Sequence, residues 1–231
     1  MAQDIKAPTI TLRQGGGSSA QSAQGLTFDT LPNLCKPCVF YGGDYNATDP
    51  NAEGFANGST LLVPDTALYT AVDVPKTIHG VITGILFMTS ATADTFDPDT
   101  ATYDIRVGVS NGNGGNSVAS GSATMSFALY GQFGVYQTAV NLTSPFTVTP
   151  GTRYWFNLLP QCTDSRNGSC SVEQFFLVNT TQETNGLNAG AQPPYEMFLN
   201  SGFFGVEWGN VCGGANTPAC ARASYGLMGH H

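Results

Sequence analysis

Apolar and polar residues alternate with a period of two along most of the chain. The clearest case is residues 103–109, where Tyr103, Ile105, Val107 and Val109 share one face. An aromatic-rich segment, residues 153–158, follows the Pro-Gly turn at 150–151. Further strand-like segments are residues 78–88, 123–130, 135–140, 146–149, 172–178, 197–199, 203–208 and 223–228.

Gly- and Asn-rich segments such as residues 111–115 separate these strands. No 12-residue window combines a 3.6-residue apolar period with helix caps. About ten short strands joined by loops predict an all-β fold with little helix, a β-sandwich of jelly-roll type.

The N-terminal region differs in composition from the rest. Residues 9–13 alternate like one strand, and residues 15–22 form a Gly/Ser-rich stretch typical of a flexible linker. We therefore expect an N-terminal strand plus linker over residues 1–25 and one β-sandwich domain over residues 26–229. Residues 230–231 are interpreted as the start of a purification tag.

Charge is scarce and its balance is acidic. The 231 residues include 8 Lys plus Arg and 16 Asp plus Glu, a net charge of −8, and charged residues are 10% of the chain against about 25% in ordinary domains. Nucleic acid is excluded as a partner, because phosphate binding needs clustered basic residues. No apolar run reaches the roughly 18 residues of a membrane span. We expect a mature secreted chain.

The cysteines form three local pairs, and their clustering predicts three short-loop disulfides in an oxidising, extracellular compartment. A redox CxxC at Cys35–Cys38 and a zinc site are the alternatives, but the first lacks a βαβ context and the second lacks ligand spacing. The pairs are Cys35/Cys38, Cys162/Cys170 and Cys212/Cys220.

Acidic residues gather in one loop and the strand after it. Calcium takes six to eight oxygen ligands, which such a loop can supply, so these residues are candidate calcium ligands. Solvated turn aspartates are the competing interpretation. The residues are Asp94, Asp97, Asp99 and Asp104.

Catalytic patterns are weak. Residues 108–112 match G-x-S-x-G, but the match precedes a Gly/Asn loop and lacks a histidine in the expected chain order, so we interpret it as a turn. Glu196 and Glu207 stand beside aromatic residues and are the candidates for a jelly-roll glycosidase. Tyr195 and Trp208 are candidate glycan contacts, as in a carbohydrate-binding module.

Several motifs from residue 62 onward resemble those of bacterial secreted "choice-of-anchor"-like proteins. The similarity implies an extracellular, often surface-linked β-sandwich with no established reaction. This chain departs from the pattern in its three cysteine pairs. The motifs are Val63-Pro64-Asp65, Ile105-Arg106-Val107-Gly108-Val109-Ser110, Gly112-Asn113-Gly114-Gly115, Val118-Ala119-Ser120-Gly121, Pro150-Gly151-Thr152-Arg153-Tyr154-Trp155, Asn200-Ser201-Gly202-Phe203-Phe204-Gly205 and Tyr225-Gly226-Leu227-Met228-Gly229.

A detached strand on a flexible tether favours assembly by strand addition, with Ile10 and Leu12 as side-chain anchors. Head-to-tail addition between copies would give filaments. We therefore expect a non-catalytic structural or adhesion protein at the cell surface, without a required cofactor, whose partners are other copies of itself. A carbohydrate-binding module and a jelly-roll glycosidase are the alternatives.

Overall fold

The computed structural model describes residues 34–43, 59–60, 66–74, 76–77, 79–91, 100–129, 135–161, 175–177, 179–180, 197–202, 205–210 and 222–230. Throughout these ranges the regular structure is β-strand, with no helix, and every recorded strand pair is antiparallel. The all-β prediction is therefore confirmed for the described part of the chain.

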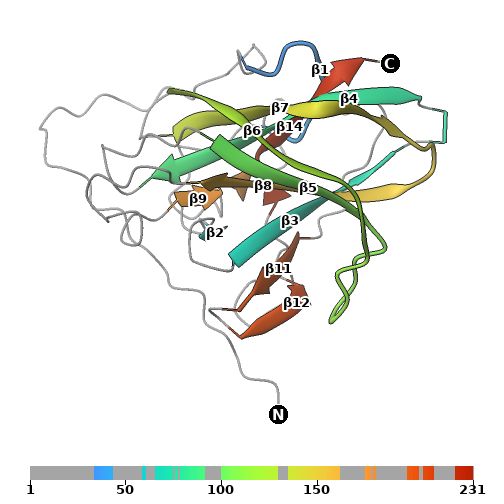
Figure 1. Cartoon of the computed structure of the whole chain (residues 1–231), viewed down its shortest axis with the longest axis vertical. Helices are drawn as coiled ribbons and strands as arrows, with labels where there is room; N and C mark the ends of the chain where they lie inside the picture. The colour runs from blue at the N-terminus through green and yellow to red at the C-terminus, as the bar shows by residue number, and fades with distance from the viewer. Residues whose placement is uncertain are drawn as a thin grey trace, which may run out of the picture.

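Ten strands follow one another in a single, strongly curled sheet that resembles half of a barrel (Figure 1). In spatial order they are β1 (Cys38–Tyr41), β14 (Tyr225–His230), β4 (Gly80–Ala91), β7 (Val135–Val148), β6 (Asn116–Leu129), β5 (Thr100–Val107), β8 (Arg153–Gln161), β3 (Thr66–Asp73), β11 (Met197–Ser201) and β12 (Val206–Asn210).

Four shorter strands lie off this path. β9 (Phe175–Leu177) pairs with both β4 and β2 (Ser59–Thr60). β10 (Asn179–Thr180) pairs with β13 (Arg222–Ala223) in a separate two-stranded sheet. Among the residues placed in the structure, no helix has the length and hydropathy needed to cross a membrane.

The curl centres on β6, which changes partner along its length. Residues 116–124 pair with β5, whereas Met125–Leu129 pair with Tyr136–Val140 of β7. The sheet therefore has two limbs joined by β6. We call β1, β14, β4 and β7 the first limb, and β5, β8, β3, β11 and β12 the second limb.

The main core lies between the facing surfaces of the two limbs. Ile85 and Phe87 come from the first limb, and Leu68, Ile105 and Phe156 come from the second. The two-residue period explains the choice, because alternate side chains of a strand point to opposite faces. On β5, Ala101, Tyr103 and Ile105 point inward and are buried. Thr102 and Asp104, which lie between them, are only partly buried.

Each limb also carries a smaller apolar cluster on its outer face. On the first limb, Leu86 and Met88 pack with Cys35, Tyr41 and Met228. β4 is thus buried on both faces, which accounts for its nearly continuous apolar sequence. On the second limb the outer cluster contains Tyr69, Ala71, Val109, Trp155, Phe198 and Trp208.

Two tyrosines connect the limbs through their hydroxyl groups. Tyr225 of β14 donates to the Ala71 carbonyl of β3 at 2.8 Å. Tyr103 of β5 lies 2.6 Å from the Thr143 hydroxyl of β7, and its oxygen also accepts from the Thr143 backbone N–H at 3.1 Å. Each buried hydroxyl is therefore satisfied across the core, as buried polar groups must be to avoid a desolvation cost.

Most of the predicted strand segments overlap strands of the structure, but the agreement is incomplete. β1, β2, β3 and β10 were not predicted, β6 begins at Asn116 rather than residue 123, and the segments predicted at 135–140 and 146–149 form one strand, β7. β14 extends to His230, which pairs with Val81. The strand predicted at residues 9–13 lies outside the described residues.

The buried hydroxyl of Tyr225 predicts a pH dependence of stability. Burial raises the pKa of Tyr225 well above its usual value. At neutral pH the hydroxyl is protonated in both the folded and unfolded states. Above pH 10 the unfolded chain loses this proton first, so the free energy of unfolding falls by up to about 1.4 kcal/mol per pH unit from this group.

The variant Tyr225→Phe removes that pH dependence. We expect its free energy of unfolding to be about 1 kcal/mol lower than that of the wild type at neutral pH, because the Ala71 carbonyl loses a hydrogen bond. Above pH 10 its free energy of unfolding should decline less steeply than that of the wild type. Chemical denaturation across this pH range measures both effects. Parallel curves for the two proteins would contradict the assignment.

Candidate functional site

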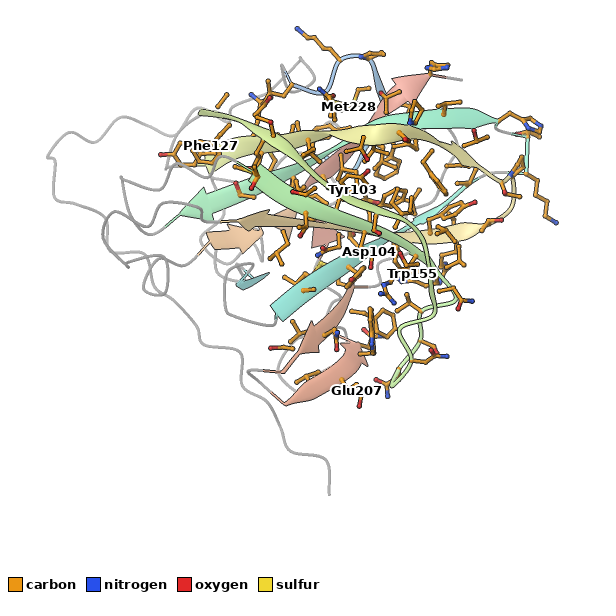
Figure 2. All side chains as sticks on the ribbon, in the orientation of Figure 1. Tyr103, Asp104, Phe127, Trp155, Glu207 and Met228 are labelled. Atoms are coloured by element: carbon orange, nitrogen blue, oxygen red, sulfur yellow. A yellow bond between two sulfur atoms is a disulfide. The ribbon has the colours of Figure 1, made fainter. Side chains whose placement is uncertain are left out.

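A cluster of polar and aromatic side chains lies on the outer face of the second limb. It consists of Tyr69 from β3, Asp104 and Arg106 from β5, Ser117 from β6 and Trp208 from β12, and we call it the Asp104 cluster. Figure 2 shows Asp104 close to Trp155, on the side where the β5–β6 hairpin reaches β12. Asp104 and Arg106 share this face because they are two positions apart on one strand.

The Asp104 carboxylate accepts three hydrogen bonds. Its Oδ2 accepts from the Tyr69 hydroxyl at 2.9 Å and from Arg106 Nε. Its Oδ1 accepts from the Ser117 hydroxyl at 2.5 Å. The Arg106 and Asp104 side chains are 24% and 16% exposed, so this ion pair is better shielded from water than a typical surface pair.

Arg106 lies between two aromatic rings and a backbone carbonyl. Its guanidinium carbon is 4.9 Å from the ring centroid of Trp208 and 5.7 Å from that of Tyr69, within the range of cation–π attraction. Its Nη1 donates to the Gly114 carbonyl at 3.0 Å. The Tyr69 and Trp208 rings are themselves 4.9 Å apart.

The cluster fixes the β5–β6 hairpin against β12. Ser110 and Asn113 exchange two backbone hydrogen bonds of 2.9 Å across the tip, and the Gly112 N–H donates to the Trp208 carbonyl at 3.0 Å. The Ser of the G-x-S-x-G match thus lies in a hairpin turn, so the turn interpretation is confirmed. Trp208 has a φ of 49°, a left-handed conformation that a bulky residue rarely adopts and that its packing must offset.

Burial and the charge of Asp104 shift the pKa values of Tyr69 and Arg106. Burial, and after it the negative charge of Asp104, raises the pKa of Tyr69. Burial lowers the pKa of Arg106, but the hydrogen bond and charge of Asp104 outweigh this effect and the pKa is raised. At neutral pH Tyr69 therefore stays protonated and Arg106 stays charged. The three donors hold the Asp104 carboxylate in one orientation.

Trp155 adds one unsatisfied group beside the cluster. It is the direct cross-strand partner of Arg106 and is 5% exposed. Its Nε1 has no hydrogen-bond acceptor among the described residues. The Arg153 guanidinium carbon lies 6.0 Å from its ring centroid, and Arg153 also binds Asp73 through bonds of 2.7 and 2.9 Å. This orphaned donor marks a local cost that the surrounding packing must balance.

Two residues that the sequence singled out for different reasons lie in the same cluster. Asp104, a candidate calcium ligand, pairs with Arg106. Trp208, a candidate glycan contact, is 8% exposed and packs on Tyr69. Both ligand roles stay predictions, and the partners that these residues have here are internal ones. Within the described ranges no three His, Cys, Asp or Glu side chains are grouped so that they could hold a metal ion.

The other predicted residues divide between the described and undescribed parts. Cys35 and Cys38 form a disulfide. Glu207 is exposed on β12, near the hairpin (Figure 2). The remaining predicted site residues lie outside the described residues: Ile10, Leu12, Asp94, Asp97, Asp99, Cys162, Cys170, Tyr195, Glu196, Cys212 and Cys220.

Sequence reasoning missed most of the Asp104 cluster. Arg106 could have been found, because it stands two positions after Asp104 in a strand whose other face is apolar. Tyr69 and Ser117 carry no local signal, since their relation to Asp104 depends on which strands neighbour β5. No protein-family model matches this chain, and no curated protein matches it.

Gly114→Ala tests the docking of the hairpin. A Cβ at this position would lie 2.3 Å from Trp208 Cε2 and 2.4 Å from Trp208 Cζ2, so the indole must move. We expect a loss of about 1–3 kcal/mol in the free energy of unfolding, as for overpacked cores, and a changed tryptophan emission spectrum. Asn111→Ala, in the exposed tip of the same hairpin, is the matched control and should leave both unchanged. Equal stability of the two variants would contradict the docked arrangement.

Proposed function

We propose that this protein is a non-catalytic extracellular structural or adhesion protein that assembles with copies of itself through its N-terminal strand. In this proposal the two limbs are the layers of a jelly-roll-type β-sandwich. The protein acts in the matrix or at the surface of a bacterial cell, in keeping with the resemblance to secreted bacterial proteins. The Cys35–Cys38 disulfide supports an oxidising compartment.

The observation that carries the proposal is the open sheet. The path of ten strands runs from β1 to β12, and among the residues that the structure describes no pairing joins these two ends. An open sheet has edge strands whose outward N–H and C=O groups can pair with another chain. An extended segment that adds there gains main-chain hydrogen bonds, while its alternate side chains give specificity.

The Asp104 cluster agrees with a structural role. Its charged pair binds backbone and side chains of the protein itself, and its aromatic rings pack on one another. These contacts hold a long hairpin and an end strand in place, which suits a protein whose activity is contact between surfaces.

Removal of residues 1–22 tests the proposal. The full chain should form filaments visible by negative-stain electron microscopy, because each copy donates one strand and accepts another without closing a ring. The shortened chain should stay monomeric in sedimentation experiments, with unchanged circular dichroism. Filaments that persist after the deletion would exclude the N-terminal strand as the donor, and a monomeric full chain would exclude assembly.

A further inference from the structure

The tip of the β5–β6 hairpin carries two consecutive Asn-Gly pairs, Asn111-Gly112 and Asn113-Gly114. Both asparagines are exposed to solvent. Asparagine is one of the thermolabile residues, because the backbone nitrogen of the next residue can attack its side-chain amide carbon and release ammonia. Glycine in the next position leaves this nitrogen unshielded, since it has no side chain and its backbone is flexible. The sequence makes the two pairs equivalent, and their surroundings distinguish them.

Asn113 is held in a conformation that favours this attack. Its Oδ1 accepts a hydrogen bond from the Gly115 N–H at 2.9 Å. The side chain therefore folds over the peptide that contains the attacking Gly114 nitrogen, as in an Asx-turn. A donor aimed at Oδ1 stabilises the negative charge that develops on this oxygen when a nitrogen adds to the amide carbon, as the donors of an oxyanion hole do.

The proton on the Gly114 nitrogen is the next requirement, because the nitrogen must lose it to act as a nucleophile. Within the described part of the chain, nothing accepts a hydrogen bond from the Gly114 N–H. The carbonyl of the same peptide, that of Asn113, accepts from the Ser110 N–H at 2.9 Å. This bond stabilises the anion that proton loss creates, because a peptide shares charge between its nitrogen and its oxygen.

Asn111 lies in a contrasting environment. The nitrogen that would attack it belongs to Gly112, whose N–H donates to the Trp208 carbonyl of β12 at 3.0 Å. Deprotonation of Gly112 breaks this bond, which is one of the contacts that dock the hairpin, and leaves the Trp208 carbonyl without its donor. The first pair is therefore protected by the docking itself.

We infer that Asn113 is a site of spontaneous deamidation, and that Asn111 is protected from the same reaction while the hairpin stays docked on β12. In the first step a bond forms between the Gly114 nitrogen and the side-chain amide carbon of Asn113, and the bond from that carbon to Nδ2 breaks. Nδ2 leaves as ammonia with the proton that Gly114 gives up, and a succinimide ring remains. Water then opens the ring at either carbonyl carbon, which yields aspartate or isoaspartate.

Both products change the contacts of the hairpin. Each carries a negative charge next to Gly114, whose carbonyl accepts from Arg106 Nη1 at 3.0 Å. In isoaspartate the chain runs through the former side chain, which lengthens the backbone by one carbon and turns the carbonyl that accepts from Ser110 into a free carboxylate. Gly114 has no space to shift toward Trp208, because even a Cβ there would lie 2.3 Å from Trp208 Cε2. Isoaspartate should therefore undock the hairpin, and Asn111 then loses its protection.

Timed peptide mapping of the full chain tests the assignment. The protein is incubated in mildly alkaline buffer below its unfolding temperature, and fragment-ion mass spectrometry assigns the mass gain of deamidation to single residues. We expect Asn113 to react at least tenfold faster than Asn111, with isoaspartate among the products. Asn116, which pairs with Val107 in the β5–β6 ladder, is the internal control and should stay intact. Equal rates at the two Asn-Gly pairs, or no reaction at Asn113, would overturn the inference.

The same measurement in concentrated urea separates the folded structure from the sequence. In the unfolded chain neither the Asn113 side chain nor the Gly112 N–H is held, so the two deamidation rates should become similar. A difference as large in urea as in buffer would show that the hairpin contacts do not set it, and the inference would fail. This comparison requires no substitution.

Loss of the docking contacts should expose the protected pair. Arg106→Gln removes the hydrogen bond to the Gly114 carbonyl and the cation–π contact with Trp208. We expect Asn111 to deamidate at least fivefold faster in this variant than in the wild type.

Arg153→Gln is the matched control, because Arg153 also lies over a tryptophan ring, that of Trp155, but its side chain bonds Asp73. Both deamidation rates should keep their wild-type values in this variant. An Arg106→Gln protein that is folded by circular dichroism and shows an unchanged Asn111 rate would contradict protection by docking.

Discussion

The divided pairing of β6 is the constraint on which the rest of this structure depends. One continuous strand pairs with β5 over residues 116–124 and with β7 from Met125 onward, so it belongs to both limbs of the sheet. Because backbone hydrogen bonds must be satisfied on burial, this exchange of partners forces the sheet to turn. The core and the two outer clusters follow from that turn.

Burial of side chains in the inner core and on the outer faces then stabilises the curled sheet. The inner core is closed by apolar side chains and by tyrosine hydroxyls that reach the opposite limb, while the outer faces are covered by the disulfide loop and the β5–β6 hairpin. A hydrogen bond made across a core adds direction to packing that is otherwise non-directional. The Asp104 cluster does the same on the outer face, where an ion pair is combined with the packing of the Tyr69 and Trp208 rings.

Much of the strand content could be predicted from the sequence, because alternation reports directly on half-buried strands such as β5 and β8. β3 was missed because Leu68 and Val72 face the core while Tyr69 and Ala71 face the outer cluster, which removes the alternation. The small residues at the start of β6, before residue 123, show no clear apolar alternation, so no strand was predicted there. The Asp104 cluster was beyond reach for a related reason: its members come from β3, β5, β6 and β12, and only the strand order brings them together.

The position of β14 has a consequence for how the chain reaches its final form. This strand, the last in the sequence, lies between β1 and β4 rather than at a margin of the sheet. The first limb therefore stays incomplete until β14 is in place, and its assembly depends on contacts between segments far apart in the sequence, which form slowly because loop closure is entropically costly. During synthesis the place between β1 and β4 stays unfilled until β14 has been made.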